Sequence, residues 1–218
     1  MDVLQRAREL AVRGLNDSLG AEGRRAVAYE MRQLVDEMVA LANSQDGNGD
    51  YLFGGNVVQT APFSDDGAGT FSYAGDAGQR SVQINPTRQL PTSDAGLDVF
   101  MKVPNPAGGY QDVFSTLNDF AVDLEANAPQ STSLAKIDSA MDHLLEFRAK
   151  IGSRLNTLDV QEDNNGFTLL QLETVKSGVQ DIDVAEVYSR LQQQTLALQA
   201  AQASFMKIQG LSLFNYLP

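Results

Sequence analysis

The chain has 218 residues, with 16 Lys and Arg against 28 Asp and Glu and a formal net charge of −12. This acidic balance argues against binding to nucleic acid, because affinity for phosphate backbones comes from clustered cations. The absence of cysteine excludes disulfides and thiolate metal sites, and the single histidine, His143, excludes multi-histidine metal centres. No apolar run approaches the ~18 residues of a membrane helix. We therefore expect no metal, no cofactor and no membrane partner.

Glycine and proline divide the chain into three parts. Residues 46–110 hold 11 of the 18 glycines and five of the seven prolines, whereas the flanking segments have few. Both residues interrupt regular structure. The sequence predicts an α+β protein: an elongated helical rod built from residues 1–45 and 111–180, a small β-rich insert at 46–110, and a C-terminal assembly helix at 181–218.

Three stretches of the rod carry apolar residues at helical spacing, and Asn16–Gly20 reads as a turn between the first two. The predicted buried stripes are Val3, Leu4, Ala7, Leu10, Ala11 and Leu15; then Val27, Met31, Leu34, Val35, Met38, Leu41 and Ala42; then Val113, Leu117, Phe120, Ala121 and Leu124.

The insert contains short β-prone runs. Residues 70–73 and 80–84 flank the loop 75–78, and this spacing predicts that the two runs form a hairpin with each other. Residues 97–103 alternate in polarity and predict a further strand that ends at Pro104.

After Pro129 the apolar spacing tightens to seven residues. The apolar residues at this interval are Ile137, Leu144, Ile151 and Leu158. A second set of positions lies three residues before each of these, and Arg148 interrupts that set. The simplest interpretation is an intramolecular bundle core. The accompanying apolar positions are Leu134, Met141 and Leu155. Residues 164–166, Asn-Asn-Gly, are expected to weaken the helix.

The C-terminal segment has a second seam, meaning a seven-residue repeat of apolar side chains like the one that runs from Ile137 to Leu158. The polar face beside this second seam is unusual. Between Leu191 and Pro218 the only charged residue is Lys207, and glutamines take the polar positions. Neutral side chains are easier to desolvate than charged ones, so this composition favours packing against other copies over a further core helix of the same bundle. We expect residues 181–218 to be poorly ordered in a lone chain and to gain order on assembly. The predicted interface consists of Val184, Val187, Leu191, Leu198, Ala201, Phe205, Ile208, Leu211, Leu213 and Phe214.

Candidate reactive residues favour structural roles. His143 has no evident nucleophile beside it. Residues 46–50 imitate the start of a calcium loop, but Tyr51 and Val57 stand where glycine and glutamate are needed. The acidic residues Asp181, Asp183 and Glu186 suit a helix N-terminus. We predict that the chain is not an enzyme.

Two regions of the sequence point to a known family. Residues 43–55 followed by Ala-Pro-Phe at 61–63, together with 189–194 and 207–217, resemble the flagellin superfamily and in particular its hook-associated members. The resemblance implies an extracellular structural protein of the bacterial flagellum that joins hook to filament by self-assembly. It also implies type III export without a cleavable signal. The implied partners are copies of the chain, neighbouring hook-associated and flagellin layers, and an export chaperone at the C-terminal region.

The resemblance also raises an expectation about the N-terminal part and leaves two alternatives. The chain opens on what resembles a later helix of the rod, so we expect the N-terminal helical region to be missing. One alternative is a filament flagellin, which shares this architecture. A remote one is an enzyme housed in residues 46–110, where His, Cys and Glu are all absent.

Overall fold

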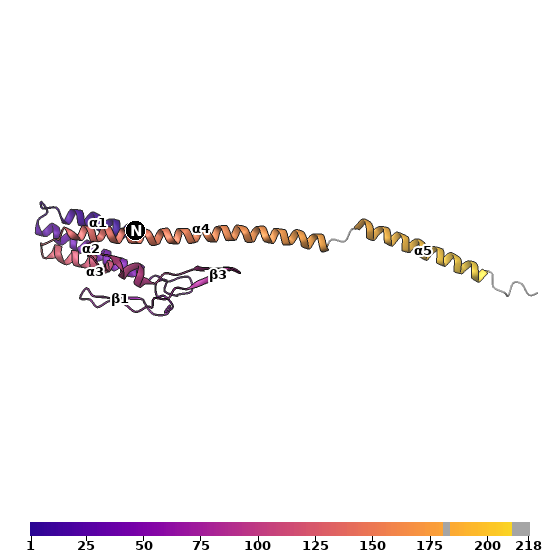
Figure 1. The fold of residues 1–218 in the computed structure, drawn as a ribbon, viewed down its shortest axis with the longest axis horizontal. Coiled ribbons are helices and arrows are strands. Elements are labelled where there is room, and N and C mark those ends of the chain that lie inside the picture. Colours follow the sequence, from indigo (N-terminus) through magenta and orange to yellow (C-terminus); the bar gives the residue numbers. More distant parts are fainter. Residues whose placement is uncertain (181–183, 211–218) are drawn as a thin grey trace, which may run out of the picture. The chain divides into compact units, whose positions relative to one another are not determined.

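The computed structural model describes residues 1–180 and 184–210, and the chain divides into two compact units, Met1–Gln161 and Glu162–Pro218. The fold is mostly helical with small two-stranded sheets, which confirms the predicted α+β class. Figure 1 shows the elements in chain order. The helices are α1 (Asp2–Gly14), α2 (Ala21–Ala42), α3 (Val113–Glu125), α4 (Thr132–Gln180) and α5 (Val184–Gly210), with a π-helix, η1, at Leu97–Met101. The strands are β1 (Phe63–Asp65), β2 (Phe71–Tyr73), β3 (Ser81–Asn85), β4 (Arg88–Pro91), β5 (Val103–Pro104) and β6 (Tyr110–Gln111).

The first unit is built on a bundle in which α2 packs against both α1 and α3. The predicted apolar stripes form its core, which confirms the helical spacing, although Leu41 is half exposed and Leu15 only partly buried. The N-terminal part of α4 closes the bundle with Ile137 and Ala140. Fully burying one large aliphatic or aromatic side chain contributes about 1.5–3 kcal/mol, so these stripes supply the main stabilisation of the unit.

Local side-chain hydrogen bonds and backbone geometry mark the turn between α1 and α2 and both ends of α3. The Asn16 carboxamide oxygen accepts hydrogen bonds from the backbone N–H and the hydroxyl of Ser18, which turns the chain between α1 and α2. The Asp112 carboxylate accepts a 2.6 Å hydrogen bond from the Ser115 N–H and thereby caps α3. Asn127 ends α3 in the left-handed region, with φ of 56°.

Arginine–carboxylate pairs bridge the helices on the outside of the bundle. Arg32 on α2 binds Glu125 on α3 through two hydrogen bonds of 2.8 and 2.9 Å, and these bonds raise the pKa of Arg32 and lower that of Glu125. Arg8 on α1 binds Asp138 on α4 at 2.6 Å. The paired side chains are about two-fifths exposed, so each pair contributes about 1 kcal/mol or less.

The strands of the insert pair differently from the prediction. Residues 71–73 and 81–85 are strands, as expected, but they do not pair with each other. Instead β2 pairs with β1, β3 pairs with β4, and β5 pairs with β6, each antiparallel. The turn between β1 and β2 is fixed by Asp66, whose carboxylate accepts hydrogen bonds from the N–H groups of Ala68 and Thr70. These local bonds favour the nearer partner over the predicted one.

The strand predicted at 97–103 is wrong over most of its length. Residues 97–101 form the π-helix η1, and only Val103 and Pro104 are in a strand. Val99 and Phe100 are both buried. Neighbouring residues of a strand point to opposite faces, whereas neighbours on a helical turn can face the same core. The chain therefore coils here so that both side chains reach the interior.

An aromatic cluster joins the insert to the bundle. The ring of Phe114, on α3, lies 5.1 Å from Phe63, 5.3 Å from Phe71 and 5.7 Å from Phe100, measured between ring centroids. Phe114 is fully buried. At the base of the insert, the Asn43 carboxamide both accepts from the Phe63 N–H and donates to the Phe63 carbonyl, each at 2.9 Å. Insert and bundle thus share one core.

Candidate assembly surface

The predicted seam residues of α5 lie exposed on the helix. Every described side chain from 184 to 209 is exposed, including Val184 and Ile208, and Leu198 retains 60 % of its accessible surface. At 100° per residue, positions seven apart recur on nearly the same side of a helix, so the seven-residue repeat forms one apolar stripe. Leu211, Leu213 and Phe214 lie outside the described residues.

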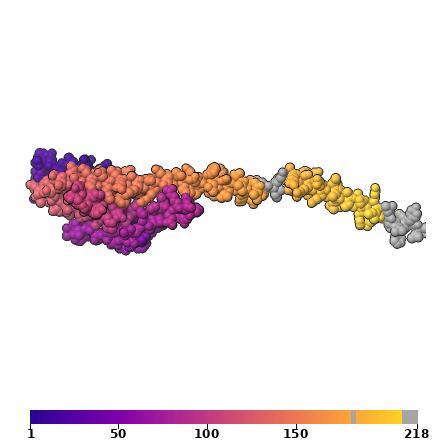
Figure 2. All heavy atoms as spheres, in the orientation of Figure 1, coloured from indigo at the N-terminus to yellow at the C-terminus, as the bar shows by residue number. Residues whose placement is uncertain are grey.

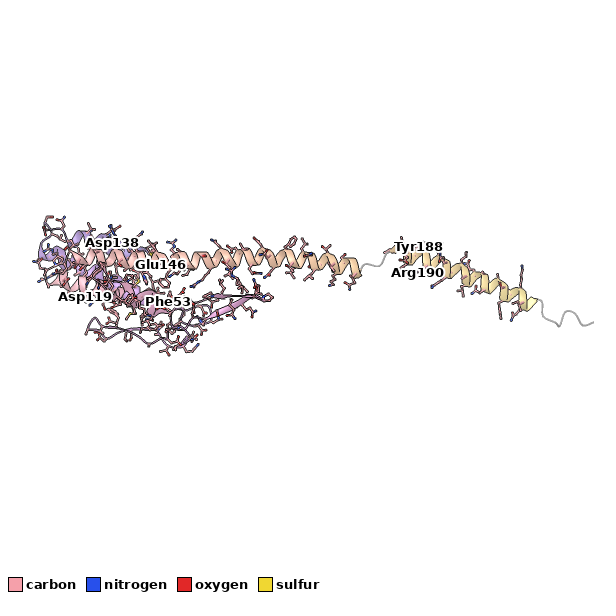
Figure 3. All side chains as sticks on the ribbon, viewed as in Figure 1. Phe53, Asp119, Asp138, Glu146, Tyr188 and Arg190 are labelled. Carbon is pink, nitrogen blue, oxygen red and sulfur yellow. The ribbon has the colours of Figure 1, made fainter. Side chains whose placement is uncertain are left out.

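The polar part of α5 is almost free of charge. Near its start the Arg190 guanidinium binds the Glu186 carboxylate at 2.7 Å, and Gln192 donates to the Tyr188 hydroxyl at 3.3 Å. In Figure 3 Tyr188 and Arg190 project from this first part of the helix. No charged residue follows until Lys207. The described part of α5 therefore offers an apolar and neutral surface rather than a chemically reactive one.

Sequence reasoning missed three large exposed side chains on α5. Tyr188, Leu196 and Met206 are more than 60 % exposed and lie outside the seven-residue repeat. A heptad search cannot find them, because it scores only one face of the helix. The sequence did hold a signal for them, because all three are large side chains with mainly apolar surface on a predicted helix. They widen the apolar surface of α5 beyond a single stripe.

The seam of α4 changes its environment along the helix. Ile137 is fully buried, and Leu134, Met141 and Leu144 pack against the core. Ile151 and Leu155 retain about half of their surface, and Leu158 retains somewhat less. The interpretation as an intramolecular core therefore holds only for the first half of the seam. The helix continues without a break through 164–166, where the sequence indicated weakness.

The second unit carries a comparable surface on its part of α4. All described side chains there are exposed, including six apolar ones: Phe167, Leu169, Leu170, Leu172, Val175 and Val179. A helix that is apolar on several sides is normally covered by neighbours. Exposed apolar area of this extent is typical of a protein interaction surface.

The other candidate residues have structural contacts. The Nε2 atom of His143 lies 2.9 Å from the Asp98 carbonyl oxygen, and its ring packs edge-on against Phe147. The Asp46 carboxylate accepts hydrogen bonds from the N–H groups of Asn48 and Asp50, which lower its pKa and fix the turn. Within the described ranges, no group of three His, Cys, Asp or Glu residues could hold a metal ion, and no helix is long and apolar enough to cross a membrane.

Comparisons with known proteins match two helical regions of the chain. The bacterial flagellin N-terminal helical region matches residues 1–58, and the bacterial flagellin C-terminal helical region matches 134–217. The first match removes the support for our expectation that the N-terminal helical region is missing.

Several individual proteins are similar over most of the chain. Flagellar hook-associated protein 3 of Escherichia coli (strain K12) is 29% identical over 97% of this chain and 72% of its own length, and the Salmonella typhimurium (strain LT2) protein of that name has the same values. A Bacillus subtilis (strain 168) flagellin is 26% identical over 92% of this chain and 66% of its own length.

Solved structures show the same fold. The flagellar hook-associated protein-3 of Legionella pneumophila superposes with a TM-score of 0.73 at 20% identity, covering 82% of this chain and 88% of that one. The Xanthomonas campestris FlgL superposes with a TM-score of 0.67 at 22% identity, covering 81% and 89%. With both helical regions matched across well over half of its length, the chain belongs to the bacterial flagellin superfamily: it is a structural protein of the extracellular flagellum and not an enzyme.

Proposed function

We infer that within the flagellum this chain is a hook–filament junction protein. The similarity to flagellar hook-associated protein 3 carries this inference, because it extends over 97% of the chain and 72% of the relative. The similarity to filament flagellin is lower and covers less of both proteins. A junction protein must bind other flagellar subunits, and the exposed apolar helices described above are suited to that task.

The parts of the chain divide this work. Residues 1–45 and 111–180 form the rod that packs beside neighbouring subunits, residues 46–110 form the insert, and residues 181–218 form the assembly segment, which contains α5. The seam from Val184 to Ile208, with Leu211, Leu213 and Phe214, binds copies of the chain, and its described part is already helical in the single chain. Burial of this neutral surface favours association without the penalty of desolvating charges.

Further partners follow from a position between hook and filament. The chain contacts a neighbouring hook-associated protein on one side and a flagellin layer on the other. Before export, a flagellar chaperone holds the C-terminal region, whose apolar side chains would otherwise associate prematurely.

The test is complementation of a flagellated bacterium that lacks its own junction protein. We expect the epitope-tagged chain to restore filaments that stay attached to hooks, with the label confined to the hook–filament boundary in electron micrographs. Label distributed along the filament would instead identify a filament flagellin. Unattached filaments together with normal secretion of the chain would contradict the junction role.

A further inference from the structure

Helix α4 loses the support of the bundle before the first unit ends at Gln161. Ile137 and Ala140 are buried in the shared core, but Ile151 and Leu155 are about half exposed. Isolated helices of a few turns are marginal in water, so a helix that leaves its bundle needs another source of stabilisation. The residues that follow the bundle are therefore the place to look for an external contact.

The insert supplies such contacts along one side of α4. Four side chains of the helix, at positions 139, 143, 154 and 161, bind groups of the insert, and at 100° per residue these positions fall on the same side. The Ser139 hydroxyl donates to the Pro104 carbonyl at 2.5 Å, and His143 lies 2.9 Å from the Asp98 carbonyl oxygen. Arg154 donates to the Asp94 carboxylate, and the Gln161 carboxamide oxygen accepts from the Asn85 amide at 3.0 Å. Figure 2 shows the insert lying against this stretch of the helix.

Arg154 makes the strongest of these attachments. Its two terminal nitrogens donate to the two carboxylate oxygens of Asp94 at 2.6 and 2.7 Å. The Arg154 side chain is 20% exposed and that of Asp94 only 10%, so the pair is shielded far more than the bundle pairs. The hydrogen bonds raise the pKa of Arg154. A bidentate pair also fixes orientation, because the planar guanidinium matches the carboxylate in one geometry.

The apolar side chains beside the Arg154–Asp94 pair do not pack closely against each other. A cleft of about 300 Å³ separates the β3–β4 hairpin from α4. Because the facing side chains leave this space, dispersion and burial contribute less than in a close-packed core. The hairpin is therefore held mainly by the Arg154–Asp94 pair at its base, just after β4 ends at Pro91, and by the Asn85–Gln161 contact at its tip. The apolar side chains lining the cleft are Leu52, Val82, Leu90, Ile151, Leu155 and Leu158.

We propose that the β3–β4 hairpin is a splint, which keeps α4 helical from Ile151 to Gln161 beyond the end of the bundle, and that Arg154 is the positioning residue that attaches it. The insert thereby has a role inside the subunit, independent of any surface that it offers to neighbours. The inference rests on contacts within the first unit and does not depend on the proposed junction function.

Hydrogen exchange of the full chain tests this proposal. Arg154→Gln removes the bidentate pair, and Arg148→Gln is the matched control, because Arg148 is exposed on the same helix and does not line the cleft beside Arg154. We expect Arg154→Gln to speed exchange of the amides of 151–161 by at least about tenfold and to leave those of α3 within about twofold. The control should change neither. Equal exchange of 151–161 in the two variants would overturn the proposal.

A second measurement covers the case in which Arg154→Gln unfolds the whole unit. The chain has no cysteine, so Asn85→Cys and Gln161→Cys can be joined selectively by a short bismaleimide. Fastening the tip of the splint in this way should slow exchange of 151–161 at least about tenfold relative to the same double variant left unlinked. Unchanged exchange on linking would show that the hairpin does not support the helix.

Discussion

A charge placed at Leu198 should block assembly and leave the folded unit intact. Leu198 retains 60 % of its surface on α5, so Leu198→Glu removes little burial from the lone chain. The core lies in residues 3–140, and the free energy of unfolding should therefore change by less than about 0.5 kcal/mol. The loss appears only when neighbouring subunits cover the helix.

The size of that loss follows from two contributions. Covering the remaining three-fifths of the leucine surface contributes about 1–2 kcal/mol, taken from about 1.5–3 kcal/mol for complete burial. An unpaired glutamate in the same contact costs several kcal/mol more. A total of at least ~4 kcal/mol corresponds to association weaker by about a thousandfold.

The assay compares incorporation of tagged variants at the hook end in cells that lack their own junction protein, alongside thermal unfolding of each purified chain. The matched control is Gln193→Glu, which introduces the same charge about 140° around the helix from Leu198. We expect Leu198→Glu to be absent from junctions and Gln193→Glu to incorporate. Normal incorporation of Leu198→Glu, or equal failure of both variants, would refute the assignment of the seam.

Two further predictions concern the first unit. Phe114→Ala should lower the free energy of unfolding, measured in urea, by about 3–5 kcal/mol, because it empties the centre of the aromatic cluster. Phe114→Leu should lower it by less than half as much. Equal losses in the two variants would argue against specific ring packing. Partial desolvation raises the pKa of Asp119, so its ionisation opposes folding at neutral pH. Asp119→Asn should accordingly stabilise the chain by less than about 1 kcal/mol at pH 7, and the gain should vanish below the unfolded-state pKa of about 3.9, where both states carry the protonated acid. Urea unfolding at the two pH values measures the difference, and a gain that persists in acid would contradict this cause.

The helices could be predicted because the apolar residues of each buried face recur at helical spacing within one short stretch of sequence. The stripe from Val3 to Leu10 needs only its own spacing to be recognised, and its burial follows. Phe114 escaped this reasoning, because it faces the insert rather than the α1–α2 side of the bundle. Its partners Phe63, Phe71 and Phe100 come from distant parts of the chain, and their meeting is a tertiary effect.

Strand pairing was the part least accessible to sequence reasoning. A strand of three to five residues can pair with several other strands, and the geometry of the turn decides which pair forms. Gly67 and Gly69 adopt positive φ in the β1–β2 turn, and Asp66 holds that turn closed. The exposure of Ile151 and Leu158 on α4 could not be predicted either. Their spacing continues that of Ile137, but the bundle that would cover them does not extend so far along the helix.

The insert enters and leaves the bundle through two helices that already touch. α2 ends at Ala42, α3 begins at Val113, and the two pack side by side. The entropy of closing a loop grows only with the logarithm of its length, so doubling the insert would cost only about 0.6 kcal/mol. Extra residues added at an exposed turn such as 105–109 would leave the closure point unchanged. The same bundle can therefore display appendages of very different size, which makes this turn a favourable site for grafting a foreign domain.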